Sequence, residues 1–315
     1  MSAARAAGLL LGVAADSIHA GPRRRHPARG RLAGSVERVV ARDRPVVNGL
    51  RVGVAAGGML LAGVAAERLG RRNPLLQLAC TAAATWAVLG GAAVAAEGAA
   101  MARALDAGDL AQARDRLPRL SRCDPEQLDQ AGLARAAVES VAESTADAMV
   151  GPLLWGAIAG VPGLLAYWTV NTLESSVLPH LLYGRHSWLG WTAARLDDVA
   201  NLVPSRVAAA LTTVCAPVVG GSAPGAWQVW RRDRTLHSSP NAGQVEAAFA
   251  GALEIRLGGR AGYPRGVANR PVLGHGRTPD AGDVTRGVEL SRVVGAVAAA
   301  ASAVLAAGVG ARRRR

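Results

Sequence analysis

The chain has 315 residues and a formal net charge of +13 at pH 7, and half of its residues are hydrophobic. Every basic residue other than histidine is Arg, and these arginines lie mainly between apolar stretches with few aromatic residues beside them. Nucleic-acid binding domains instead cluster basic residues on one face, so that function is not expected. Charge confined to the connections between apolar stretches is typical of a membrane protein.

The apolar stretches are long enough to predict several membrane segments. A spanning helix needs about 20 mostly apolar residues. The candidate stretches are residues 6–15, which is marginal, 52–66, which is short, and 75–96, 148–173, 207–230 and 293–311. Residues 6–15 resemble a signal peptide, but Asp16 and His19 suit one poorly, and we expect this stretch to remain as a membrane segment. We predict an all-α, polytopic integral membrane protein that forms one membrane-embedded domain over residues 1–315.

Polar regions separate these stretches. Residues 21–51 are rich in Arg, and residues 97–147 predict an amphipathic insertion of one or two helices, broken near Pro118 and Pro125. Residues 174–206 form a further polar connection. Residues 231–292 are rich in Gly and Pro, so a long polar loop with irregular structure is expected there. The widely spaced Cys80, Cys123 and Cys215 predict neither a disulfide framework nor a zinc site.

The distribution of arginine predicts a topology that conflicts with a shared active site. Residues 21–51, 67–74, 97–147, 174–206 and 231–292 hold nine, three, six, three and ten arginines. The positive-inside rule then places 174–206 on the face opposite the other polar regions. Gly and Pro interrupt both 148–173 and 207–230, and re-entrant backbone is tolerated where protein or a water-filled cavity covers it. We therefore predict that at least one of these stretches is a hairpin that returns 174–206 to the cytoplasmic face.

Three carboxylates precede the apolar stretch at 148. Glu139, Glu143 and Asp147 are spaced by four, which places them on one face of a helix. Like charges at this spacing repel, so either the face is solvated or a cation lies against it. Both interpretations stay open from the residues alone.

A second group of polar residues follows the same apolar stretch. Asn171 and Glu174 come at its end, where an amide often only caps a helix. Arg195, Asp197, Asp198, Asn201 and Arg206 then fall within twelve residues. Oxygen ligands of this kind suit Mg²⁺, and arginines can bind phosphate with two hydrogen bonds. Adjacent carboxylates diverge by about 100° on a helix, and an ion pair between Arg195 and Asp198 is the simpler alternative.

The third candidate segment is H-S-S-P-N-A-G, which runs from His237 to Gly243 and is followed by Glu246. A helix that begins near Gly243 would direct its N–H groups at an anion. The same string also fits an ordinary turn and helix cap. No P-loop, Rossmann fingerprint or H-E-x-x-H zinc motif is present in the sequence.

Together these strings resemble the CobD/CbiB family of cobalamin biosynthesis proteins. Residues 194–206 carry the family string A-R-L-D-D-x-x-N-x-x-P-x-R complete, and residues 239–243 carry S-P-N-A-G. Residues 170–175 match V-N-T-L-D-S with Glu174 in place of Asp, and residues 143–147 match E-N-x-S-D at Glu143 and Asp147 only. Gln244 and Val245 replace an aromatic-Pro pair, whereas the later Gly258-Gly259 matches, and His26-Pro27 resembles a family H-P-V string.

The resemblance implies an enzyme of the cell membrane with cytoplasmic active loops. The family attaches aminopropanol, or its O-phosphate, to adenosylcobyric acid through an amide bond, with ATP and Mg²⁺. The implied partners are the corrinoid, the amine and other late cobalamin enzymes. A membrane carrier or a non-catalytic scaffold is the alternative, because carriers also use broken helices. The residues expected to act in catalysis are Asp197, Asp198, Glu143, Glu246 and His237, with either of the last two as general base. Those expected to bind substrate are Arg195, Arg206, Asn171, Asn201, Asn241, Gly243 and His26. The expected Mg²⁺ ligands are Asp197, Asp198 and Asp147 or Glu143.

Overall fold

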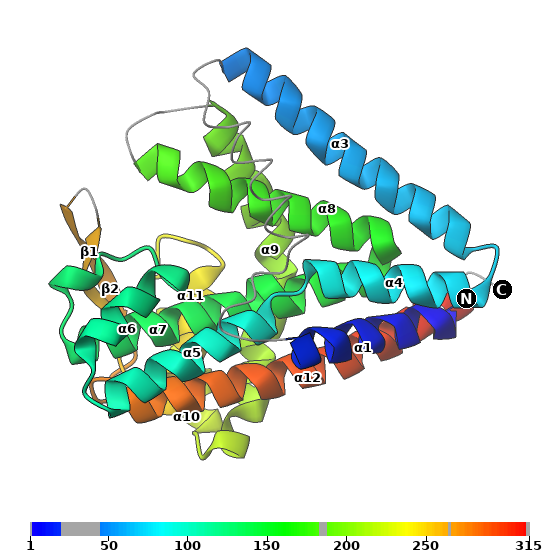
Figure 1. Cartoon of the computed structure of the whole chain (residues 1–315). Coiled ribbons are helices and arrows are strands. Elements are labelled where there is room, and N and C mark those ends of the chain that lie inside the picture. Colours follow the sequence, from blue (N-terminus) through cyan, green and yellow to red (C-terminus); the bar gives the residue numbers. More distant parts are fainter. Residues whose placement is uncertain (1, 20–44, 183–187, 264–265, 313–315) are drawn as a thin grey trace.

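The computed structural model describes residues 2–19, 45–182, 188–263 and 266–312 (Figure 1). Within these ranges nearly all of the chain is helical, and the one sheet is an antiparallel hairpin. The helices are α1 (Ser2–His19), α3 (Pro45–Gly70), α4 (Pro74–Val88), α5 (Gly91–Asp106), α6 (Leu110–Arg116), α7 (Gln130–Thr145), α8 (Gly151–Leu182), α9 (Trp188–Cys215), α10 (Ala223–Asp233), α11 (Ala242–Leu253) and α12 (Ala281–Arg312), and the hairpin joins β1 (Leu257–Tyr263) to β2 (Gly266–Leu273).

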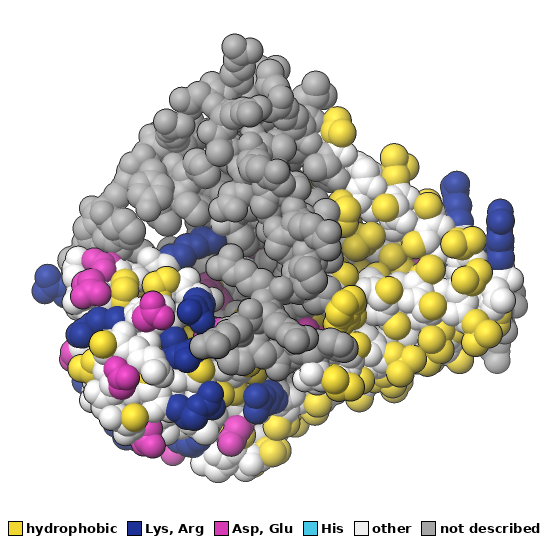
Figure 2. Space-filling view, viewed as in Figure 1, with side chains coloured by type: hydrophobic (Ala, Val, Ile, Leu, Met, Phe, Trp, Pro, Cys, Tyr) yellow, Lys and Arg dark blue, Asp and Glu magenta, His cyan; other side chains and the backbone are white. Residues whose placement is uncertain are grey.

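The helices form a membrane-embedded region and a polar end. Four described segments are long and apolar enough to cross a membrane, namely Pro74–Asp106, Gln130–Ser175, Trp191–Val219 and Ala281–Val309. In Figure 2 hydrophobic side chains cover the side formed by α1, α4 and α12, whereas charged side chains gather at the opposite end, around α6 and the β hairpin. The prediction of an all-α membrane protein is confirmed.

Helix α8 reverses direction at Gly160. This residue has φ +71° and ψ −153°, a conformation that essentially only glycine adopts. The two arms of α8 then lie antiparallel, because Gly151 packs against Tyr167 and Gly156 packs against Leu164. Beyond the reversal, the buried carboxylate of Glu67 accepts a hydrogen bond from the N–H of Val161. The first of the two interrupted stretches therefore forms a hairpin.

The second interrupted stretch, residues 207–230, does not form one span, so that prediction is wrong. Helix α9 ends at Cys215, a 3₁₀ turn covers Ala216–Val219, and α10 begins at Ala223 after the N-cap Ser222. Gly220 takes a left-handed conformation (φ +68°) and closes the turn. The segment long enough to span is Trp191–Val219, which contains the polar string 194–206.

The loop predicted at residues 231–292 is largely ordered into α11 and the β hairpin. Helix α11 is buried along its whole length, which fixes Glu246 among the helices around it. Gly258 has φ +81°, and a Cβ there would lie 2.0 Å from the carbonyl oxygen of Pro271. Its N–H donates to Glu139 on α7 at 2.7 Å. The Gly-rich sequence is therefore needed for a bulged strand that approaches α7 closely.

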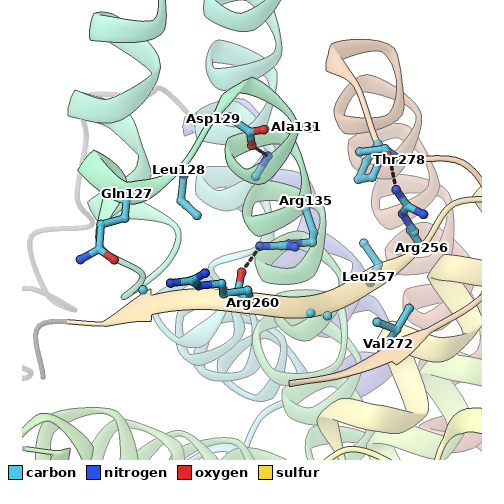
Figure 3. A pocket seen from close by; sticks show the side chains of 15 residues that line it. Gln127, Leu128, Asp129, Ala131, Arg135, Arg256, Leu257, Arg260, Val272 and Thr278 are labelled. Atoms are coloured by element: carbon cyan, nitrogen blue, oxygen red, sulfur yellow. Dashed lines mark hydrogen bonds between the residues drawn. The ribbon is translucent and has the colours of Figure 1, made fainter. Parts of the chain in front are cut away.

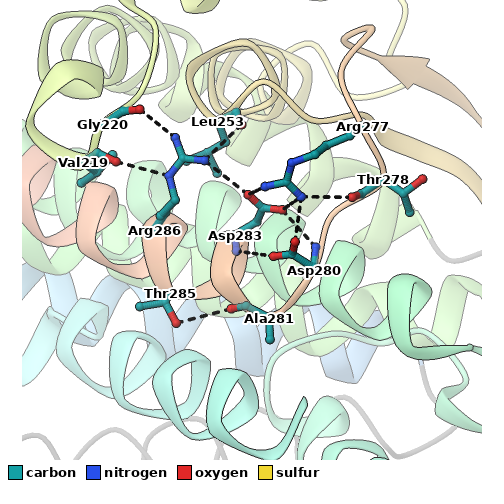
Figure 4. A network of polar contacts seen from close by, with 10 residues as sticks. All are labelled: Val219, Gly220, Leu253, Arg277, Thr278, Asp280, Ala281, Asp283, Thr285 and Arg286. Carbon is teal, nitrogen blue, oxygen red and sulfur yellow. Dashed lines mark hydrogen bonds and ion pairs between the residues drawn. The ribbon is translucent and has the colours of Figure 1, made fainter. Parts of the chain in front are cut away.

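A buried ion cluster fastens the start of α12 to the neighbouring turns (Figure 4). The fully buried Asp283 accepts hydrogen bonds from Arg277 at 2.7 Å and from Arg286 at 3.4 Å. Arg286 also donates to the carbonyl oxygens of Val219 and Gly220 in the turn after α9. This cluster fastens the turn after α9 to the start of α12.

Candidate functional site

The predicted site residues meet at a cavity of about 350 Å³, here called the acidic pocket. Segments that are far apart in the sequence form its walls: the end of α7 with the π turn Ala146–Val150, the second arm of α8, helix α9, and the start of α11. Its lining residues are Glu143, Ala146, Asp147, Glu174, Ala194, Asp197, Asp198, Asn201, Ser205, Ser238, Ser239, Asn241, Ala242 and Val245.

The pocket is lined by acidic side chains. Five carboxylates line it, and no Arg, Lys or His is among its described lining residues. The side chains of Glu143, Asp147 and Glu174 make no hydrogen bond or ion pair with any residue of the described ranges. The cations nearby lie outside the lining: Arg195 is 3.4 Å from Asp198, and Arg122 donates to the carbonyl oxygen of Ser175 at 2.8 Å. Crowded, unpaired carboxylates attract a cation, so the pocket suits a metal ion or an ammonium group.

Asp197 is the carboxylate that the protein holds most firmly. Asn201 donates to its Oδ2 at 3.1 Å, and Asn171 donates to its Oδ1 at 3.4 Å across from α8. Asn201 is itself held by the Tyr167 hydroxyl, which lies 2.7 Å from its Oδ1. Asn171 and Asn201, expected to bind substrate, therefore orient Asp197.

Asp198 points in a different direction from Asp197, as expected for adjacent helical residues. Its carboxylate lies 3.4 Å from Arg195, so the simpler alternative, an ion pair, is present together with the pocket. Arg195 is exposed and stacks over Trp191, with 5.7 Å from its Cζ to the ring centroid. Arg206 is also exposed and donates to the carbonyl oxygen of Leu202. Neither arginine lines the pocket.

The S-P-N-A-G string forms the wall opposite α9. Asn241 donates to the backbone carbonyl of Asp198 at 2.8 Å and accepts from Ser205 at 3.2 Å. Ser239 accepts hydrogen bonds from the N–H groups of Asn241 and Ala242 and so caps α11. Gly243 is buried, and a Cβ there would lie 2.6 Å from the carbonyl of Arg234. This string therefore packs α11 against α9, and the N–H groups of Asn241 and Ala242 already have a partner in Ser239.

Glu246 and His237 lie behind the pocket and do not line it. Arg270 on β2 donates to both carboxylate oxygens of Glu246, at 2.9 and 3.0 Å, and to Glu139 at 2.7 Å. It also lies 2.8 Å from Nε2 of His237. A guanidinium only donates, so its position beside Nε2 favours the neutral imidazole over the imidazolium. Burial and the neighbouring Arg270 lower the pKa of His237 and outweigh its hydrogen bond to the backbone of Ser239.

The donors of the pocket fit Mg²⁺ in chemistry, although they form no complete cage. All of its acidic ligands are oxygens, which Mg²⁺ prefers. Among the described residues, no three His, Cys, Asp or Glu side chains stand close enough to hold a metal ion by themselves. Mg²⁺ usually keeps several waters and takes one or two carboxylates with substrate phosphates. The chemistry of these ligands is therefore compatible with Mg²⁺, which would need further ligands such as water or phosphate oxygens here.

Sequence reasoning missed Tyr167 and Arg270. Tyr167 precedes Asn171 by four residues, so helical spacing alone places the two on one face. Arg270 gave no comparable signal, because its strand was expected to be an irregular loop. His26 lies outside the described residues.

Comparison with known proteins agrees with these strings. A family model described as CobD/Cbib protein matches residues 9–291. The chain belongs to the CobD/CbiB family. No solved structure matches this member of the family significantly.

Relatives of this CobD/CbiB protein cover nearly its whole length. A protein of Mycobacterium tuberculosis (strain ATCC 25618 / H37Rv), named cobalamin biosynthesis protein CobD, is 49% identical over 304 residues, which is 96% of each chain. Proteins with the same name from Chromobacterium violaceum and Klebsiella pneumoniae are 38% and 36% identical and cover 87% of this chain.

Proposed function

We propose that this protein is a membrane-bound synthase that joins aminopropanol, or its O-phosphate, to a carboxyl group of adenosylcobyric acid. The observation that carries the proposal is the acidic pocket, where four separate family strings meet. Family membership and the names of the relatives support a role in cobalamin biosynthesis. We place the pocket on the cytoplasmic side of the cell membrane, where ATP is available.

The charge of the pocket suits the amine half of this reaction. Aminopropanol carries an ammonium group at neutral pH, and an unpaired carboxylate can bind it and then accept its proton. The neutral amine attacks the substrate carboxyl carbon after ATP has activated that carboxyl as an acyl phosphate; the C–N bond forms and phosphate leaves. Glu143 is the best placed general base, because it is exposed to the pocket and has no partner among the described residues. Glu246 and His237 are held by Arg270 and support the wall instead.

Magnesium, when bound, offsets the negative charge of the phosphate groups. We assign its protein ligands to Asp197 with Asp147 or Asp198, all of which line the pocket. Arg195 and Arg206 stand outside the lining, so their proposed part is to attract an anionic substrate to the rim.

A carrier for a cationic or corrinoid solute is the second candidate, because the reversal of α8 at Gly160 resembles the broken helices that form carrier binding sites. ATP consumption separates the two candidates. A synthase should hydrolyse ATP only when the corrinoid and the amine are both present. It should consume one ATP for each amide formed. Transport of either compound into vesicles without ATP consumption or amide formation would favour the carrier.

A further inference from the structure

A second hollow, of about 620 Å³, lies between the start of α7 and the β hairpin (Figure 3). We call it the basic pocket, because three arginines line it, Arg135, Arg256 and Arg260. Figure 3 shows β1 below the hollow and the first turns of α7 above it. The size falls within the range of 300–1,000 Å³ that is typical of small-molecule sites.

The arginines keep most of their donors available. Arg135 donates to the carbonyl oxygen of Arg260 at 2.6 Å and lies 3.9 Å from Glu139. Arg256 donates to the hydroxyl of Thr278 at 2.6 Å. The guanidinium of Arg260 forms no ion pair or hydrogen bond anywhere in the described ranges.

The lining contains one carboxylate, Asp129, and it is already engaged. Its side chain accepts the N–H of Gly132 at 2.8 Å as the N-cap of α7. The balance of three guanidiniums against one carboxylate gives the hollow a net positive charge. Apolar side chains, among them Leu128, Leu257 and Val272, complete the walls. A ligand with a phosphate group and a less polar part matches this combination.

The backbone of β1 leaves room beside the arginines. Gly259 has φ +83°, and a Cβ there would lie 3.3 Å from Nη1 of Arg135. A larger side chain at this position would fill the space between the strand and the guanidinium. Gly259 therefore leaves the strand without a side chain where an anion would approach Arg135.

One face of α7 connects the basic pocket to the acidic pocket. Arg135, Glu139, Glu143 and Asp147 follow one another at a spacing of four residues. Arg135 lines the basic pocket and Glu143 lines the acidic pocket. Eight residues of helix separate them by about 12 Å. Between them Glu139 is held by Arg270 and by the N–H of Gly258.

We propose that the basic pocket binds the phosphate groups of a nucleoside polyphosphate. The role of that ligand as phosphoryl donor rests on the proposed function, whereas the binding itself does not. The two pockets on one helix face would hold the phosphoryl donor and the amine at neighbouring positions, with the corrinoid carboxyl group that receives the phosphoryl group between them.

Binding of ATP to the full-length protein in detergent tests the proposal, with EDTA present so that no metal bridges ATP to the acidic pocket. Arg260→Ala is the main variant, because Arg260 is exposed and without a described partner, so its removal should leave folding intact. We expect affinity to fall about tenfold or more, since charge-assisted hydrogen bonds to phosphate are lost. Arg231→Ala, an exposed arginine that stacks on Trp227 away from this pocket, is the matched control and should bind as wild type.

Further probes distinguish the ligand sources and the two proposals. Tripolyphosphate should compete with ATP, whereas aminopropanol O-phosphate should compete weakly. Asp197→Asn should still bind ATP even where amide synthesis is lost. If the wild-type protein binds ATP through Arg260 but has no synthase activity, the proposed reaction is wrong and the proposed anion site stands. Equal affinity in wild type and Arg260→Ala, no ATP binding at millimolar concentration, or stronger binding of aminopropanol O-phosphate than of ATP would overturn the proposal.

Discussion

At the scale of single residues, the site is defined by which carboxylates have partners. Asp197 accepts hydrogen bonds from two side-chain amides, and Asp198 forms an ion pair with Arg195. The Glu143 side chain lines the pocket without a hydrogen bond or ion pair within the described residues. The sequence predicted these residues because their strings are distinctive. The sequence could not distinguish residues that line the cavity from residues that support its wall. Glu246 supports the wall because Arg270 binds it, and Arg270 lies on a strand that no sequence pattern predicted.

Glu143→Gln should lower the rate of amide formation by about 100-fold or more, which is the usual contribution of a general base. The amide keeps the size of the side chain but cannot take up the proton of the amine. Single-turnover assays at saturating amine measure this directly. Asp115→Asn, an exposed carboxylate on α6, is the control and should retain wild-type rates. A Glu143→Gln rate within tenfold of wild type would remove Glu143 from the general base role.

His237 predicts a pH dependence of stability. Its pKa is lowered in the folded protein, so the unfolded chain takes up a proton first as the pH falls. Its stabilising contribution is therefore complete above the unfolded value of about 6.5 and is lost as the pH falls through the folded pKa. Thermal unfolding in detergent between pH 7.5 and 5.5 should show a smaller loss of stability in His237→Gln than in wild type.

The neighbouring Ser238→Ala removes a side chain that does not titrate, so it should keep the wild-type slope. An unchanged slope in His237→Gln would show that other groups cause the pH dependence.

At the scale of elements, Gly and Pro correctly predicted where the apolar stretches are interrupted. They did not predict which structure each interruption forms. Both 148–173 and 207–230 carry such residues, but the first reverses at a single glycine within α8, whereas the second breaks into the end of α9, a turn and the separate helix α10. The difference lies in the contacts: the reversal at Gly160 is supported by Glu67, whereas the break near Gly220 leads into a separate helix, α10. Long-range partners of this kind are absent from local sequence patterns.

Gly160→Ala should destabilise the hairpin. The φ of +71° is strained for alanine by about 1–3 kcal/mol, and the added Cβ would also lie 2.5 Å from Oε2 of Glu67. Denaturation in mild detergent should therefore begin at lower temperature. Gly57→Ala is the control, because a Cβ at Gly57 meets nothing within 4 Å. Equal unfolding temperatures for the two variants would contradict the reversal.

At the scale of the whole molecule, the hairpin in α8 returns its second arm to the end where α7 meets the π turn, as a cytoplasmic position of both polar regions would require. Ser205 donates to Asn241, so the string 194–206 meets the segment 231–292 on one side, as the shared site requires. The α3–α4 turn lies at the opposite end, beside both termini (Figure 1). The predicted membrane class was correct because composition decides it, whereas the arrangement of spans depends on packing.

Cysteine labelling tests this arrangement. In a chain without its three native cysteines, Glu126→Cys and Ser238→Cys should react with a membrane-impermeant maleimide from the same side. Arg72→Cys, in the α3–α4 turn, should react from the other side. All three positions are exposed. Labelling of Glu126→Cys and Arg72→Cys from one side would contradict the division into a polar end and a distal turn.

The most direct measurement is the mass of the product formed by membranes that contain this protein. They receive adenosylcobyric acid, aminopropanol O-phosphate, ATP and Mg²⁺. We predict a new corrinoid mass that equals the sum of acid and amine less one water, present with wild type and Asp115→Asn and absent with Asp197→Asn. No such product from folded, membrane-inserted wild-type protein, or equal product from Asp197→Asn, would contradict the synthase assignment at the acidic pocket.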